Sequence, residues 1–154
     1  MHPPLRLLNR GGARVVTRTK GVLSHDTMAA VRPLRVLVVE DSVDTAEALG
    51  LQLREWGHTY RICASGNEAL ALAPYFRPNV VLIDIGLPDM SGWELARYLP
   101  ANAVLIAVSA RGEDNDFRRS QLAGIGYHLV KPAYQRQLRE LLERIAPAVR
   151  DETE

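Results

Sequence analysis

Residues 80–88 read VVLIDIGLP, so four apolar residues lead directly into an aspartate. Two further runs are of the same kind, VLVV at residues 36–39 and VLIAV at residues 104–108. None of the three alternates apolar with polar residues, which is typical of strands covered on both faces. We therefore expect three central strands in a sheet that carries helices on both sides.

Two weaker runs predict the outer strands of the same sheet. Residues 60–63 (YRIC) are partly polar, and residues 127–130 (YHLV) form a short run that stops before Pro132. A helical pattern follows each of the five runs. Five repeats of strand and helix predict an α/β fold with parallel strands joined by right-handed crossovers, which is a doubly wound sheet.

The ends of several helices can be read directly. Apolar residues recur at helical spacing from Ala46 to Trp56, and Gly57 is expected to end that helix in a left-handed conformation. Two Ser-x-x-Glu stretches fit the capping box, in which a hydroxyl and a carboxylate satisfy the free amides of a helix start. The two stretches are Ser65 with Glu68 and Ser91 with Glu94. Two further helices are predicted over residues 117–123, before Gly124, and over residues 135–149.

Length and composition indicate one folded domain with tails. The chain has 154 residues, 47% hydrophobic and 24% charged, which is ordinary globular usage. The single cysteine, Cys63, can form neither an internal disulfide nor a thiolate zinc site, so a reducing cytoplasm is the expected location. No stretch approaches the roughly 18 apolar residues of a membrane span. We expect the domain over residues 34–148 and a short tail at 149–154.

Residues 1–33 differ from the rest in charge. They contain six basic residues and one acidic residue, about +5, which leaves about −4 for the remainder of a chain of net charge +1. They show no sustained apolar period and contain a Gly-Gly and a Pro-Pro pair, so we expect a disordered basic extension. Translation could instead begin at Met28, and we assign the extension no function.

Polar residues follow the predicted strands where chemistry is expected. In such sheets the ligand site lies beyond the carboxyl ends of the strands. There the sequence places Glu40, Asp41, Asp84, Ser109 and Lys131. Three carboxylates brought together need a compensating cation, and Mg²⁺ prefers such oxygen ligands. A lysine and a hydroxyl beside them suit phosphoryl transfer to an aspartate.

Each of these residues also has a plainer interpretation. Asp41 or Ser42 could simply cap the first helix, Ser109 could be a loop serine, and Lys131 a surface lysine. Asp84 is harder to explain as a turn residue, because it follows four apolar residues. Their joint placement at four strand ends favours the functional interpretation.

Three stretches carry a resemblance to a known family. Residues 36–41 (VLVVED), 80–92 (VVLIDIGLPDMSG) and 129–132 (LVKP) resemble the receiver domain of bacterial two-component response regulators. The sequence VSA at residues 108–110 lies between the last two, as in that family. The resemblance covers about residues 35–146 and implies a flavodoxin-like (βα)5 sheet with strand order 2-1-3-4-5.

The resemblance also implies roles for individual residues. Asp84 would accept a phosphoryl group from a sensor histidine kinase or a histidine phosphotransfer protein. Asp41, Asp84 and the backbone carbonyl of Gly86 would bind Mg²⁺ directly, and Glu40 would act through water. Ser109 and Lys131 would contact phosphoryl oxygens, and the Lys131–Pro132 bond would be cis. We would then expect a phosphoacceptor signalling domain that acts through an unknown protein target or passes the phosphoryl group onward in a phosphorelay, and not a conventional enzyme.

Two departures from the family pattern matter. The switch position three residues before the lysine, usually Tyr or Phe, is His128, which leaves open a switch formed by Ser109 and His128 or a purely structural histidine. Residues 149–154 are too few for an output domain, so we expect a single-domain regulator.

Three other functions compete with this interpretation. They are a receiver-like interaction module that is not phosphorylated, nucleic-acid binding through residues 1–33, and a haloacid-dehalogenase-type phosphatase. The phosphatase would carry a second aspartate at position 86, where this chain has Gly86. Nucleic-acid binding is not expected from the remainder of the chain.

Overall fold

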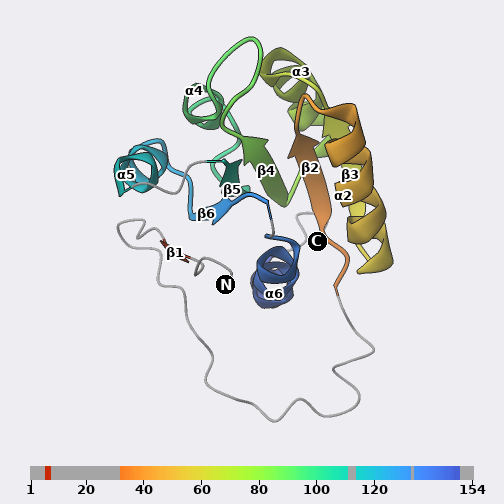
Figure 1. Ribbon diagram of the computed structural model, residues 1–154. Coiled ribbons are helices and arrows are strands. Elements are labelled where there is room, and N and C mark those ends of the chain that lie inside the picture. Colours follow the sequence, from red (N-terminus) through yellow and green to blue (C-terminus); the bar gives the residue numbers. More distant parts are fainter. Residues whose placement is uncertain (1–5, 8–31, 111–113, 133, 150–154) are drawn as a thin grey trace.

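The fold is an α/β sandwich around one sheet (Figure 1). The computed structural model describes residues 6–7, 32–110, 114–132 and 134–149. The elements in chain order are β1 (Arg6–Leu7), β2 (Arg35–Val39), α2 (Val43–Glu55), β3 (Thr59–Cys63), α3 (Gly66–Phe76), β4 (Val80–Asp84), α4 (Gly92–Ala96), β5 (Val104–Ser109), α5 (Asp114–Leu122), β6 (Tyr127–Val130), α6 (Gln135–Ile145) and a 3₁₀ turn (Ala146–Ala148).

The sheet has the predicted topology. Five parallel strands lie in the order β3-β2-β4-β5-β6, which confirms the doubly wound fold with strand order 2-1-3-4-5. A sixth strand, β1, pairs antiparallel with the outer edge of β6, with Arg6 opposite His128 and Leu7 opposite Tyr127. Apart from these two residues and Arg32–Pro33, the basic extension lies outside the described residues.

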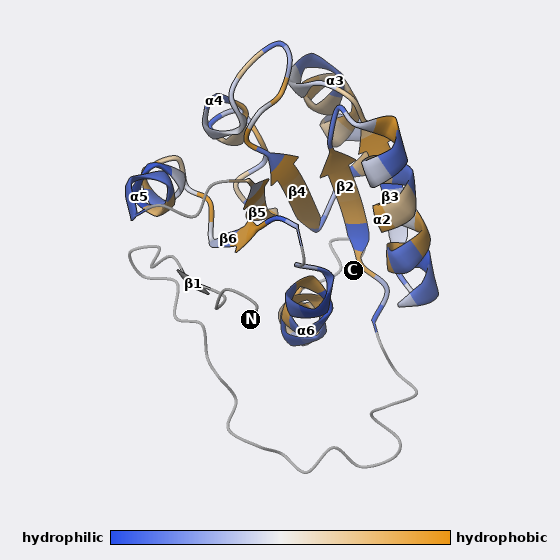
Figure 2. Cartoon of the chain, viewed as in Figure 1, coloured by the Kyte–Doolittle hydropathy of each residue, from blue (hydrophilic) through white to orange (hydrophobic). Residues whose placement is uncertain are grey.

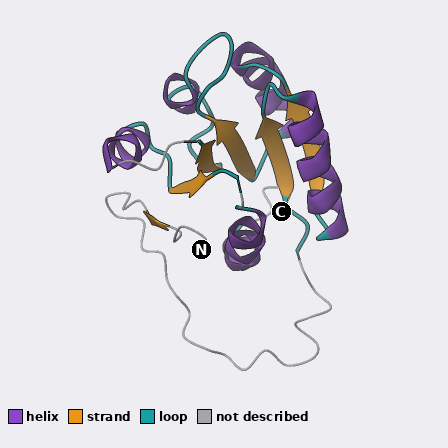
Figure 3. Cartoon of the chain, in the orientation of Figure 1, coloured by secondary structure: helices purple, strands orange, loops and turns teal. Residues whose placement is uncertain are grey.

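Helices cover both faces of the sheet (Figure 3). Alternate residues of β2 point to opposite faces: Leu37 and Val39 pack with α3, α4 and α5, whereas Val36 and Val38 pack with α2 and α6. The central strands β2, β4 and β5 are accordingly apolar along most of their length, while the helices carry polar residues on their outer sides (Figure 2). None of the helices described is long and apolar enough to cross a membrane.

Most predicted helix ends are observed. Gly57 and Gly124 have φ angles of 94° and 85°, as expected for left-handed helix stops. The backbone N–H of Glu68 donates to Ser65 Oγ at 3.2 Å, but the Glu68 carboxylate accepts from Ala64 rather than from Ser65. The hydroxyl of Ser91 caps α4 through the N–H of Glu94 at 3.1 Å.

Two helix boundaries differ from the prediction. The last α-helix ends at Ile145 instead of Val149, because Pro147 has no N–H to continue the helical pattern and the chain tightens into a 3₁₀ turn. Helix α5 begins at Asp114, three residues before the predicted start at Phe117. Its first turn carries two aspartates, which favour a helix start through the helix dipole and leave no apolar signal.

Candidate phosphoacceptor site

Three carboxylates meet where β2 and β4 end. Glu40 follows the last residue of β2, and Asp84 is the last residue of β4. Together with Asp41 they can each offer an oxygen within 4.8 Å of the others, and we call this group the acidic cluster. Glu40 is buried, Asp84 is half-buried and Asp41 is exposed, so the cluster opens to solvent on one side. A hard divalent cation fits this all-oxygen donor set.

Lys131 faces the acidic cluster from the end of β6. Its Nζ lies 3.3 Å from Glu40 Oε1 and 3.4 Å from Asp84 Oδ2. Its backbone N–H donates to the carbonyl of Ser109 at 2.8 Å, which ties it to the end of β5. The peptide bond between Lys131 and Pro132 is cis. One cation thus lies against two carboxylates at the carboxyl edge of the sheet.

The loop after β4 folds back over Asp84. The N–H of Gly86 donates to Asp84 Oδ1 at 3.0 Å, so the two carboxylate oxygens of Asp84 have different partners. Gly92 passes so close that a Cβ there would lie 2.8 Å from the backbone oxygen of Asp84. A side chain at position 92 would therefore push the loop away from Asp84.

Asp89 fixes the far side of that loop. Its carboxylate accepts from the N–H groups of Gly66 and Asn67 at 2.9 and 2.8 Å, at the start of α3. These bonds lower the pKa of Asp89. This role could not be predicted from the sequence, since an aspartate 22 residues from its partner leaves no local pattern.

The pKa values of Glu40 and Asp84 are shifted in opposite directions. Burial raises the pKa of Glu40 to about 7, and its hydrogen bond to Asp84 and the charge of Asp84 add to the effect. Burial also acts to raise the pKa of Asp84, but hydrogen bonds from Glu40 and Gly86 and the charge of Lys131 outweigh it and lower this pKa. Asp84 is therefore ionised near neutral pH, whereas Glu40, with its pKa of about 7, titrates there, and a bound cation would favour loss of its proton.

Ser109 lies at the end of β5 beside a buried histidine. Its Oγ is 2.7 Å from Nε2 of His128, whose side chain is 1% exposed. His128 points into the protein between the sheet and α5, with its ring centroid 4.6 Å from that of Phe117. The two residues predicted as a switch pair are thus in direct contact.

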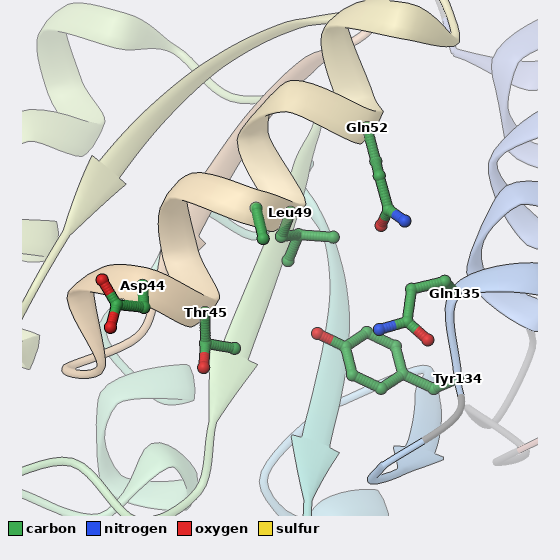
Figure 4. A pocket seen from close by; sticks show the side chains of 7 residues that line it. Asp44, Thr45, Leu49, Gln52, Tyr134 and Gln135 are labelled. Atoms are coloured by element: carbon green, nitrogen blue, oxygen red, sulfur yellow. The ribbon is translucent and has the colours of Figure 1, made fainter.

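A small void and a larger groove both border Tyr134 near the acidic cluster. Glu40, Asp84 and Lys131 line a void of only about 10 Å³ together with Tyr134. A groove of about 340 Å³ lies on the other side of Tyr134, between α2 and the start of α6, and the Tyr134 ring faces into it beside Leu49 (Figure 4). Burial, with the charges of Glu40 and Asp84, raises the pKa of Tyr134 to about 12. The site suits a small group presented from solvent.

The doubly wound sheet carries an acidic cluster, a lysine and a serine at its carboxyl edge. Comparison with known proteins identifies the family to which this chain belongs. Residues 36–143 match the response regulator receiver domain. The chain therefore belongs to the receiver domain family of two-component response regulators, which is a family of signalling domains.

Relatives and solved structures agree with this assignment. The transcriptional regulatory protein KdpE of Mycobacterium tuberculosis is 34% identical over 120 residues, which cover 77% of this chain and 52% of that protein. A 14.6 kDa protein of Leptolyngbya boryana is 29% identical and matched over 93% of its length. The CheY-like receiver domain protein of Methanospirillum hungatei superposes with a TM-score of 0.70 at 28% identity, over 75% of this chain and 95% of that one. The chain spans about half the length of KdpE.

Proposed function

We propose that Asp84 accepts a phosphoryl group from a histidine of a sensor kinase or of a histidine phosphotransfer protein, in the cytoplasm. The observation that carries this proposal is the contact between Lys131 Nζ and Asp84 Oδ2 at 3.4 Å inside the acidic cluster. In the transfer, an Asp84 oxygen forms a bond to phosphorus while the bond from phosphorus to the histidine nitrogen breaks. The receiver, over residues 34–148, then signals through a protein target.

The residues of the acidic cluster and its neighbours have different roles in this transfer. Asp41, Asp84 and the Gly86 carbonyl would hold Mg²⁺, and Glu40 would act through a bound water. When bound, Mg²⁺ offsets negative charge on the transferring group. Lys131 contributes a second positive charge at the same group, and the Ser109 hydroxyl donates to one of its oxygens.

The same residues support loss of the phosphoryl group by hydrolysis without a further enzyme. The site is open to solvent at Asp41, so water can reach the phosphorus of the aspartyl phosphate. Attack by that water breaks the bond between phosphorus and the Asp84 oxygen and releases inorganic phosphate. This self-catalysed acceptance and hydrolysis is the full extent of the chemistry that we propose.

Intact-mass measurement after incubation with Mg²⁺ and acetyl phosphate tests the proposal. We expect one added phosphoryl group, lost on mild base treatment, on the unmodified chain. Asp84→Asn should gain none, whereas the matched variant Asp44→Asn, which removes an exposed carboxylate of α2, should be modified like the unmodified chain. Equal modification of Asp84→Asn would overturn the assignment of the acceptor.

A further inference from the structure

A continuous series of hydrogen bonds leads from the acceptor site to the outer helices. Ser109 Oγ lies 2.7 Å from His128 Nε2, and His128 Nδ1 lies 3.0 Å from Ser120 Oγ. The indole N–H of Trp93 then donates to Ser120 Oγ at 2.8 Å. We call Ser109, His128, Ser120 and Trp93 the buried hydrogen-bond path. It joins β5, β6, α5 and α4, four elements that are separate along the sequence.

Three of the four members of the path are almost fully removed from water. Relative exposures are 7% for Ser109, 1% for His128 and 0% for Ser120. Inside a protein a broken hydrogen bond leaves buried polar atoms unsatisfied, which is energetically costly. A movement of one member is therefore passed to the next, because the partners move together rather than separate.

The donors along the path have a definite direction. An indole N–H can only donate, so Ser120 Oγ accepts from Trp93. We infer that the Ser120 hydroxyl in turn donates to Nδ1 of His128, because Ser120 is fully buried and its hydrogen would otherwise have no acceptor among the described residues. A neutral imidazole with Nδ1 as acceptor carries its hydrogen on Nε2, which donates to Ser109 Oγ. Two groups cannot donate to each other, so the Ser109 hydroxyl hydrogen is directed away from His128.

The far end of the path lies at the protein surface. Trp93 is half-buried on α4, and the guanidinium of Arg119 on α5 lies 4.0 Å from the centre of its indole ring. Arg119 is exposed. A shift of the Trp93 ring would therefore change how an exposed cation is presented where α4 and α5 meet.

We propose that the buried hydrogen-bond path couples occupancy of Asp84 to the position of Trp93 and Arg119, with His128 and Ser120 as positioning residues. This inference rests on the proposed function, since a phosphoryl group on Asp84 supplies the acceptor that draws the Ser109 hydroxyl. The movement of Ser109 then reaches α4 and α5 through hydrogen bonds instead of through an aromatic side chain.

NMR of the two indole N–H groups tests the coupling, with beryllofluoride and Mg²⁺ as a mimic of the phosphoryl group. Trp56, on the opposite face of the sheet, is the internal reference. We expect the Trp93 signal to shift and the Trp56 signal to stay. In Ser120→Ala the Trp93 shift should fall at least about threefold, because the path is cut in its middle. Thr59→Val, which removes a hydroxyl on the far edge strand β3, should keep the full shift.

Fluorine NMR of bound beryllofluoride in the same samples separates the two proposals. No bound signal on the unmodified chain would count against the proposed function itself. Bound beryllofluoride with an unshifted Trp93, or with an equal shift in Ser120→Ala, would overturn the coupling alone.

A second measurement does not depend on that variant. Nitrogen shifts of the His128 ring should show hydrogen on Nε2 in the unmodified chain, and hydrogen on Nδ1 would overturn the proposed direction of the path. Trp93→Phe removes the indole donor, so the preference for Nε2 should weaken. If the hydrogen stays on Nε2 of His128 to the same extent in Trp93→Phe, Trp93 has no role in setting the His128 tautomer.

Discussion

Two networks leave the carboxyl edge of the sheet, and they are built from opposite kinds of groups. The acidic cluster with Lys131 is charged and open to solvent at Asp41. The buried hydrogen-bond path contains a serine and a histidine that are each at most 1% exposed. The first arrangement can exchange a cation or a phosphoryl group with solvent, whereas the second can only rearrange internally. We propose that the charged network carries out the chemistry and that the buried network provides the coupling.

The largest expected effect concerns the charged network. Lys131→Met removes the cation beside Asp84, and we expect the rate of phosphorylation by acetyl phosphate to fall about 100- to 1000-fold, as for loss of one charge-stabilising donor. The rate of mass increase measures it. Arg136→Met, which removes an exposed cation of α6, should leave the rate unchanged. A fall of less than about threefold in Lys131→Met, small against that expectation, would remove the lysine from the chemistry.

For folding stability, we expect a variant in the buried network to have a larger effect than a variant in the charged network. Ser120→Ala leaves the Trp93 indole N–H and His128 Nδ1 without their shared partner, so we expect a loss of about 1–3 kcal/mol in urea unfolding. Lys131→Met should cost less than about 1 kcal/mol, because its ion pairs are partly exposed. Equal losses in the two variants would break the proposed division between the networks.

A smaller effect on folding stability is expected at a second buried histidine, His58, which provides a comparison with His128. His58 Nδ1 accepts from the N–H of Leu34 at 3.0 Å, and burial lowers the pKa of His58 below its usual 6.5. The folded state then binds fewer protons than the unfolded state, so this contribution is present above pH 6.5 and is lost as the pH falls below it. Urea unfolding across that range should show a smaller acid-side loss in His58→Asn, whose amide oxygen can accept the same bond. An identical pH profile would contradict a neutral buried His58.

The sequence predicts the charged network better than the buried one, for a physical reason. Runs of apolar residues fix where strands end, and parallel strands bring their carboxyl ends to one edge, so Glu40, Asp84 and Lys131 could be placed together. Ser120 and Trp93 could not, because they meet His128 only through the packing of α4 and α5 on the sheet. His128 was recognised as a departure from the family pattern, yet its partner on α5 leaves no sequence signal.

In the fold, likewise, the elements with a local sequence pattern could be predicted and those without one could not. Central strands were predicted from composition and periodicity alone, and Gly57 and Gly124 marked two helix ends. Pairing of Arg6–Leu7 with β6 has no such signal, since two residues are too few for a period.

The account depends most directly on the phosphorylation of Asp84. Peptide mapping by mass spectrometry after acetyl phosphate and Mg²⁺ treatment should locate one modification at Asp84, once borohydride has reduced the aspartyl phosphate to the stable alcohol homoserine with release of phosphate. Chelation of Mg²⁺ before the incubation should abolish it. A modification at another residue, or equal labelling without Mg²⁺, would contradict the account.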